Sequence, residues 1–374
     1  MEGRDGYLYG RGVTDNKGPI LAALFAVKEM KEQGKLNVNV NFVIEGEEEC
    51  DSAGFQTAIH NNKHLLADTD LLLFSNEQWL AEETPCLVFG MRGIIQIEVE
   101  IIGAKVDLHS GIDGGVLNEP LVDLIHLLSG LVQGDGKVLV PDFYDDVEGV
   151  TDDEKEIYEK VGFDVRGYGK KIGVSSFLTS DPLYFLMRRW RYPTLSIHSV
   201  GTAHVGSSTI LPKSAKGSIS IRTVPNMSNE RITGIVHTYL RQKFKSMLSP
   251  NKLSVKTVRT GDWWKGDPHT PYFSAAKEAI KSVWGVEPLL TRSGGTIPTT
   301  KFLAEEFNCE AIHLPMGQAS DNQHLPNERI RMKNLLKGKQ VIKDLLTRVA
   351  SIPIKDKEQK KEKKKERENE DEQK

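Results

Sequence analysis

Two turns rich in carboxylates carry the residue types that could hold a metal ion. One contains Asp15, between a polar segment and a helix-forming run, and the other is Glu45-Gly46-Glu47-Glu48-Glu49, after an alternating apolar run. Carboxylates crowded together repel one another unless something cationic binds near them. A divalent cation would account for both turns, although the turns taken alone are better explained as solvated acidic loops.

A histidine supplies the third kind of ligand. His324 follows a predicted strand and the turn that begins at Gly317. Ligands of parallel α/β sheets bind outside the carboxyl ends of the strands. An Asp, a Glu and a His at three such ends are the set of a catalytic zinc site, with water as the fourth ligand. A spare glutamate beside the liganding one would serve as general base.

The elements that must position these residues alternate in type. The spacing of apolar residues predicts helices over 18–33 and 52–62 and strands over 36–44 and 71–75. The same rhythm returns later, with a helix over 272–283, a strand over 309–315 and a helix over 331–350. This order predicts an α/β domain with a largely parallel sheet.

A second pattern interrupts the first. Strands are predicted over 94–102, 195–200, 216–224 and 253–260, with helices over 118–133 and 229–246. Strand-helix-strand-strand-helix-strand is the order of a ferredoxin-like, split-βαβ domain. We therefore expect an α/β domain in two pieces, 1–92 and 261–352, an inserted domain over 93–260, and a charged, unpacked tail over 353–374. Residues 134–190 have no assigned role.

Composition excludes several classes of protein. The chain has 374 residues, 39% hydrophobic and 27% charged, with a net charge of −3. It lacks the basic face of a nucleic-acid-binding protein, and no run of 18 apolar residues predicts a membrane span. The first residues do not form a signal peptide, and three scattered cysteines form no disulfide framework, so a cytoplasmic protein with reduced thiols is expected.

Eight motifs resemble, in order, those of the M20 metallopeptidases: GRGVTDNKGP, EGEEECDSAGF, SNEQWL, PCLVFGMRG, DLHSGIDGG, SIRTVPNMS, RSGGTIP and LPMGQASDNQH. The resemblance covers nearly the whole chain before the tail and is closest to the carnosine and Cys-Gly dipeptidases. The sequence around SNEQWL is most similar to that of the M20 subunit of the fungal glutathione-degradation complex. That subunit acts with a glutaminase-like (amidotransferase-like) partner.

This resemblance implies roles for individual residues. Asp15 resembles the carboxylate that bridges two zinc ions, and Glu49 and His324 resemble ligands of one of them. Glu48 resembles the general base, and His109 the histidine that the inserted domain lends to the partner subunit's site to stabilise the oxyanion.

The resemblance also implies a substrate-binding set. Arg222 and Thr209 resemble groups that hold the C-terminal side of the substrate, for which a guanidinium fork suits a carboxylate. Gly294 and Gly295 would let the backbone approach the substrate, and Thr296 would donate its hydroxyl.

Three departures from the family pattern affect these implications. No histidine is followed two residues later by Asp, so the family's H-x-D motif, which serves the second zinc, is missing. Asn76 stands where that zinc has an acidic ligand, and an amide oxygen binds zinc poorly; Glu77, if on the same strand, would point away. Ser293 replaces the glutamate that holds the substrate's amine in the dipeptidases. One zinc site is therefore expected to be intact and the second impaired, with Mn²⁺ as an alternative ion.

The leading hypothesis is a dimeric, metal-dependent peptidase or amidohydrolase acting on small peptides, glutathione among them. The alternative is a catalytically impaired scaffold subunit that positions the glutaminase-like partner, which the missing H-x-D and Asn76 favour. A plain acidic-loop binding protein is the third alternative.

Overall fold

The computed structural model describes residues 2–50, 52–202 and 209–353, and these form two compact units. Unit 1 contains the described residues up to Phe89, Gly266–Thr291 and those from Thr299 onward, whereas unit 2 contains Gly90–Lys265 and Arg292–Pro298 apart from its undescribed loop. The tail that was predicted over 353–374 lies, from residue 354, outside the described residues. No helix in the described part of the chain is long and apolar enough to span a membrane.

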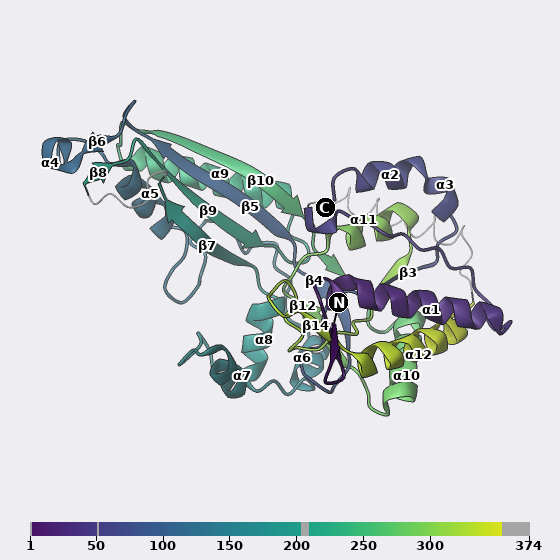
Figure 1. Cartoon of the computed structure of the whole chain (residues 1–374). Helices are drawn as coiled ribbons and strands as arrows, with labels where there is room; N and C mark the ends of the chain where they lie inside the picture. The colour runs from purple at the N-terminus through teal and green to yellow at the C-terminus, as the bar shows by residue number, and fades with distance from the viewer. Residues whose placement is uncertain (1, 51, 203–208, 354–374) are drawn as a thin grey trace. The chain divides into compact units, whose positions relative to one another are not determined.

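Three long helices form the helical layer of unit 1 (Figure 1): α1 (Gly18–Glu32), α10 (Pro271–Trp284) and α12 (Met332–Val349). Proline suits the first turn of α1 and α10 because the backbone N–H there has no partner within the helix. The Thr270 side chain also caps α10 by accepting from the backbone N–H of Phe273. Helix α12 packs against both α1 and α10, so the three apolar faces share one core.

The sheet of unit 1 is mixed. Its strands are β3 (Leu71–Phe74), β4 (Cys86–Met91), β11 (Trp264–Lys265), β12 (Leu289–Ser293) and β13 (Glu310–His313). The boundary between the units passes through β4 and β12, and β11 belongs to unit 2. Strand β13 runs parallel to β3 but antiparallel to β4. The α/β class is confirmed, and the sheet is mixed rather than largely parallel, because β4 pairs in the antiparallel sense with both β13 and β11. One strand that was expected in this domain is also absent.

That strand was predicted over 36–44, and the structure places no strand there. The segment has the alternating apolar residues of a strand, but its side chains are largely exposed: Phe42 is 40% accessible and Ile44 60%. An extended segment becomes a strand only when another strand accepts its backbone hydrogen bonds, and no described strand pairs with this one. The prediction was wrong because alternation reports side chains and not the presence of a neighbour.

The remaining elements of unit 1 are short. They comprise a three-stranded antiparallel sheet of β1 (Glu2–Arg4), β2 (Tyr7–Tyr9) and β14 (Arg329–Arg331), the single-turn elements η1 (Val13–Lys17) and η2 (Glu48–Cys50), and the helices α2 (Phe55–Asn61), α3 (Lys63–Leu66) and α11 (Pro298–Phe307). The small sheet matters for the site because β14 brings the region around residue 328 beside η1.

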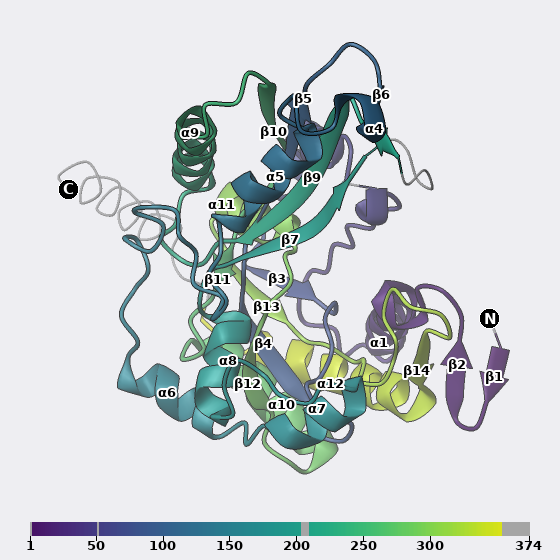
Figure 2. The same ribbon diagram turned by 90° about the vertical axis from the view of Figure 1, so that its left-hand side faces the viewer.

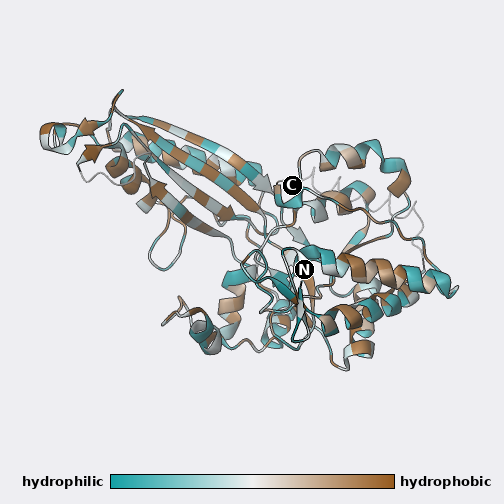
Figure 3. Cartoon of the chain, in the orientation of Figure 1, coloured by the Kyte–Doolittle hydropathy of each residue, from teal (hydrophilic) through white to brown (hydrophobic). Residues whose placement is uncertain are grey.

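Unit 2 is built on a four-stranded antiparallel sheet in the order β10-β5-β9-β7, from β5 (Ile94–Ile102), β7 (Thr194–Gly201), β9 (Ser214–Arg222) and β10 (Lys252–Gly261). Helices α5 (Pro120–Ser129) and α9 (Asn229–Ser246) lie side by side against it (Figure 2). Apolar and polar residues alternate along the strands (Figure 3), and the apolar set faces the helices as one core. This is the predicted ferredoxin-like order.

The other elements of unit 2 are a small β6–β8 ribbon and the helices of the acidic segment. They are β6 (Leu108–His109), β8 (Ile210–Leu211), β11 (Trp264–Lys265), α4 (Ser110–Asp113), α6 (Asp152–Glu159), α7 (Val165–Ile172) and α8 (Pro182–Trp190). Residues 134–190, which had no assigned role, thus contain three helices. They are anchored by Glu154, a buried carboxylate that pairs with Arg191 and Arg292.

Candidate metal centre

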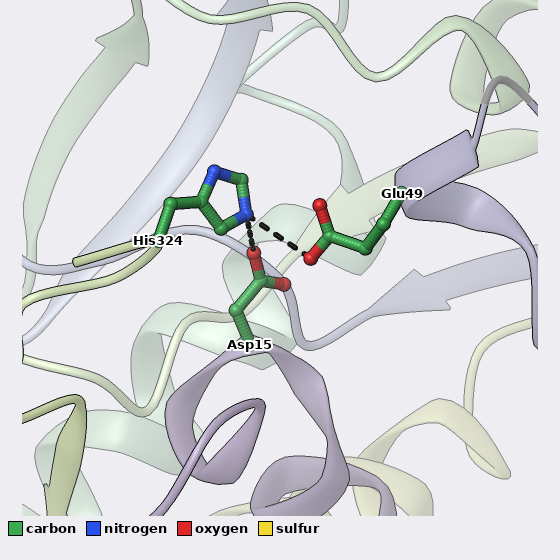
Figure 4. Close-up of side chains that lie close together, drawn as sticks. All are labelled: Asp15, Glu49 and His324. Carbon is green, nitrogen blue, oxygen red and sulfur yellow. Dashed lines mark hydrogen bonds and ion pairs between the residues drawn. The ribbon is translucent and has the colours of Figure 1, made fainter. Parts of the chain in front are cut away.

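Three of the predicted ligands lie together in unit 1 (Figure 4). The Nε2 atom of His324 is 2.9 Å from an oxygen of Asp15 and 3.2 Å from an oxygen of Glu49. One ligand atom from each residue lies within 4.8 Å of the others. The three residues come from η1, η2 and the loop before β14, so segments more than 300 residues apart in sequence converge here.

The Asp15 loop is held by a buried glutamate that the sequence analysis missed. Glu328, which is 2% exposed, accepts from the backbone N–H groups of Gly12 (2.8 Å), Thr14 (3.1 Å) and Asp15 (3.2 Å). Gly12 has a φ of 78°, a backbone conformation that favours glycine. Glu328 therefore fixes the backbone from which the Asp15 carboxylate projects.

Charged and polar neighbours surround the three ligands. Arg11 bridges Glu49 (2.5 Å) and Glu328 (3.0 Å), and the Gln323 amide donates to the same oxygen of Asp15 that faces His324. His324 has a φ of 62°, uncommon for a residue with a side chain and typical of functional sites. Arg11 and Gln323 thus supply donors to the oxygens of these two carboxylates.

Glu48 lies beside the ligand cluster and is half-buried. Burial raises the pKa of its carboxyl, and the negative charges of Glu49 and Asp15 raise it further. A carboxylate that gains protons readily suits a group that accepts a proton from water and passes it on. The direction of the shift thus distinguishes Glu48 from an ordinary surface glutamate.

The donor set fits a zinc-like cation. Two ligands about 2.0 Å from a tetrahedral ion lie about 3.3 Å apart, and the two contacts of His324 Nε2, 2.9 and 3.2 Å, are close to that separation. One imidazole nitrogen and two carboxylates form a mixed donor set that zinc accepts in catalytic sites. Asp15, Glu49 and His324 would hold the ion.

Two other predicted residues, His109 and Thr209, lie near each other in the β6–β8 region of unit 2. His109 pairs with Ile210 across the ribbon, and the backbone N–H of Ser110 donates to the carbonyl oxygen of Thr209 at 2.8 Å. Both side chains are exposed, and the Nδ1 atom of His109 accepts from the backbone N–H of Gly111. That contact fixes the imidazole with Nδ1 as acceptor, which leaves Nε2 as the protonated nitrogen of the neutral ring.

The remaining substrate-binding candidates gather on one turn of unit 2. Arg222 Nη1 donates to Thr296 Oγ1 at 2.7 Å. Ser293 Oγ accepts from the backbone N–H of Gly295 at 2.9 Å, which closes the turn. A Cβ atom on Gly294 would lie 2.9 Å from the carbonyl oxygen of Arg189, so this position has no room for a larger residue.

Asn76 differs from its expected place. Strand β3 ends at Phe74, so Asn76 and Glu77 follow the strand and do not lie on it. The φ of Glu77 is 81°, which is not a strand conformation. The prediction that its side chain points away assumed that Glu77 lies on a strand, and that premise was wrong. The amide oxygen of Asn76 accepts from the backbone N–H of Glu77.

Comparison with known proteins places this architecture in a family. Residues 1–348 match the family model described as peptidase family M20/M25/M40. The chain belongs to this family. This M20 chain is 36% identical to the probable di- and tripeptidase DUG2 of Saccharomyces cerevisiae over 88% of its own length, but it spans only 37% of that relative. It is 38% identical to the Cys-Gly metallodipeptidase DUG1 of the same organism, covering 89% of this chain and 70% of DUG1.

Solved structures agree with the sequence relatives. The M20 chain superposes on the dipeptidase Dug1p of Saccharomyces cerevisiae with a TM-score of 0.85 and 36% identity, covering 93% of this chain and 74% of Dug1p. Human carnosine dipeptidase 1 gives 0.84 with 34% identity, covering 94% and 75%. The predicted resemblance to carnosine and Cys-Gly dipeptidases is confirmed, and the family is one of metallopeptidases that require a divalent cation.

Proposed function

We propose that this chain hydrolyses amide bonds of small peptides with the help of one divalent cation, zinc foremost and Mn²⁺ as the alternative. The observation that carries the proposal is the convergence of Asp15, Glu49 and His324 with the half-buried Glu48 beside them. Several relatives are named as di- or tripeptidases, which supports this reaction type. The scaffold alternative has no comparable support, because these relatives are named as peptidases.

The roles of the residues follow from their positions. A bound cation supplies Lewis-acid polarisation of the scissile carbonyl and favours ionisation of water. Glu48 takes a proton from the attacking water and returns it to the leaving amine. Glu328 and Arg11 keep the two carboxylate ligands in place. His109, exposed on the β6–β8 ribbon, would donate to the developing oxyanion of a second subunit.

One cation rather than two is proposed because Asn76, the predicted ligand of a second ion, is an amide. Its oxygen already accepts from the backbone N–H of Glu77. An amide is a poorer zinc ligand than a carboxylate. We further propose a homodimer formed through unit 2 and a glutaminase-like protein partner, on the strength of the family resemblance.

Zinc content and hydrolysis test the proposal together. Purified protein and an Asp15→Ala variant would be dialysed against zinc and measured by elemental analysis, then assayed with Cys-Gly and glutathione. We expect about one zinc per chain, lost in the variant together with hydrolysis. No zinc in the wild-type protein would refute the metal site, and zinc without hydrolysis of any small peptide would refute the peptidase.

A further inference from the structure

Two arginines of unit 2, the buried Arg292 and the half-buried Arg92, differ in how their charges are balanced. Arg292 lies 2.8 Å from an oxygen of Glu154, and the other oxygen of that carboxylate lies 3.2 Å from Arg191. Arg92 has no carboxylate within ion-pair distance in the described structure. A buried positive charge is costly unless an anion balances it. Arg92 is therefore a cation of this region for which the described residues supply no carboxylate.

The contacts of Arg92 leave one end of its guanidinium group available. Its Nε donates to the carbonyl oxygen of Gly294, and its Nη1 donates to the carbonyl oxygen of Tyr192 and to Thr194 Oγ1, each at 3.3 Å. Its Nη2 makes no hydrogen bond within the described residues and lies 3.0 Å from where a Cβ of Gly294 would stand. The two N–H donors of Nη2 thus lie beside Gly294.

A second arginine is attached to the same turn. Thr296 Oγ1 accepts from Arg222 and donates to the carbonyl oxygen of Arg92, so one hydroxyl links the two segments. Burial, together with the positive charges of Arg222 and Arg189, lowers the pKa of Arg92 to about 9. Burial also lowers the pKa of Arg222, as does the charge of Arg259. Repulsion within this group is relieved when anions bind.

We propose that Arg92 and Arg222 bind two carboxylate groups of one substrate, so that the peptidase acts on small amides that carry two acidic groups. The inference rests on the proposed function for its reaction and on the geometry of unit 2 for its substrate class. Peptides with a glutamyl or aspartyl residue, joined through either carboxyl group, belong to this class. Ser293 is consistent with it, because its hydroxyl brings no negative charge that would compete for Arg92.

Calorimetric titration of metal-free protein with small acids tests this inference without hydrolysis. The protein would be kept in chelator and titrated with glutarate, a dicarboxylate, and with butyrate, its monocarboxylate counterpart. A charge-assisted hydrogen-bonding partner contributes about 1.5–3 kcal/mol, so glutarate should bind about 10- to 100-fold more tightly. Equal affinity of the wild-type protein for the two acids would overturn the inference.

Variants assign the preference to residues. Arg92→Gln should abolish the difference between glutarate and butyrate, whereas Arg222→Gln should weaken both. Arg188→Gln is the matched control, because Arg188 donates to the carbonyl oxygen of Asp135, away from the turn. A glutarate preference that persists in folded Arg92→Gln would refute the role of Arg92. If that variant does not fold, the wild-type comparison still decides the substrate class.

The two proposals fail separately. If glutarate binds preferentially in chelator but the zinc-loaded protein hydrolyses no peptide, the peptidase proposal is refuted and the dicarboxylate site stands. If the protein hydrolyses neutral dipeptides but binds glutarate no more tightly than butyrate, the dicarboxylate site is refuted and the peptidase proposal stands.

Discussion

Replacing Glu328 with glutamine is expected to destabilise unit 1 and to weaken the metal site at the same time. One carboxylate oxygen accepts from Gly12 N–H (2.8 Å) and Arg11 (3.0 Å), and the other accepts from Thr14 N–H (3.1 Å) and Asp15 N–H (3.2 Å). Each oxygen thus receives two donors. A glutamine amide has only one oxygen, so either orientation turns its NH₂ group toward two other donors.

The magnitude follows from the bonds that are lost. A hydrogen bond to a buried charged group contributes about 1.5–3 kcal/mol, which gives about 3–6 kcal/mol for two. Because about half of the Arg11 side chain is exposed, solvent screens its share, and about 3–4 kcal/mol is the better expectation. Because the backbone of Asp15 loses an anchor, zinc affinity should fall about 10-fold, as for other groups that orient metal ligands.

Two measurements check this prediction. Urea denaturation in chelator reports the free energy of unfolding, and competition with a chromophoric chelator reports zinc affinity. Glu83→Gln is the control, because Glu83 is two-thirds exposed and, among the described residues, its ion pair is with Arg331. Glu328→Asp keeps the charge and should recover part of both losses. If the Glu328→Gln protein keeps the same free energy of unfolding and the same zinc affinity, the Asp15 loop is held by other contacts.

Three further predictions address single residues. Glu48→Gln should abolish hydrolysis while zinc content stays at about one per chain, since base and ligand are separate residues; surviving activity would show that another group is the base. Asn76→Asp alone should not raise zinc content, and a second zinc in that variant would refute the single-site proposal. Burial lowers the pKa of His313 from 6.5 to about 3, so the unfolded state binds more protons between these values and acidification favours unfolding. The free energy of unfolding should therefore fall by up to about 1.4 kcal/mol per pH unit below pH 6.5, less steeply in His313→Gln, and parallel pH curves for the two proteins would contradict this.

The sequence by itself determined most of the elements and predicted the candidate ligands. Helical periodicity located α1, α9 and α12, and alternation located β5 and β9, because these elements bury one face against their own unit. The motifs around Asp15, Glu49 and His324 indicated a metal, because chemistry requires those side chains whatever the surrounding fold.

Only the tertiary structure decided which segments found partners. The alternation over 36–44 predicted a strand, but whether a neighbour accepts its backbone hydrogen bonds is a property of distant segments. The roles of Glu328 and Arg92 could not be predicted from the sequence. A charged residue has the same sequence signal whether it is solvated, anchors a loop or binds an anion. Only folding gathers three backbone N–H groups around Glu328. Only folding places Arg92 where no carboxylate of the described residues lies beside it. Their roles follow from burial, which makes an unpaired charge costly and a paired one structurally decisive.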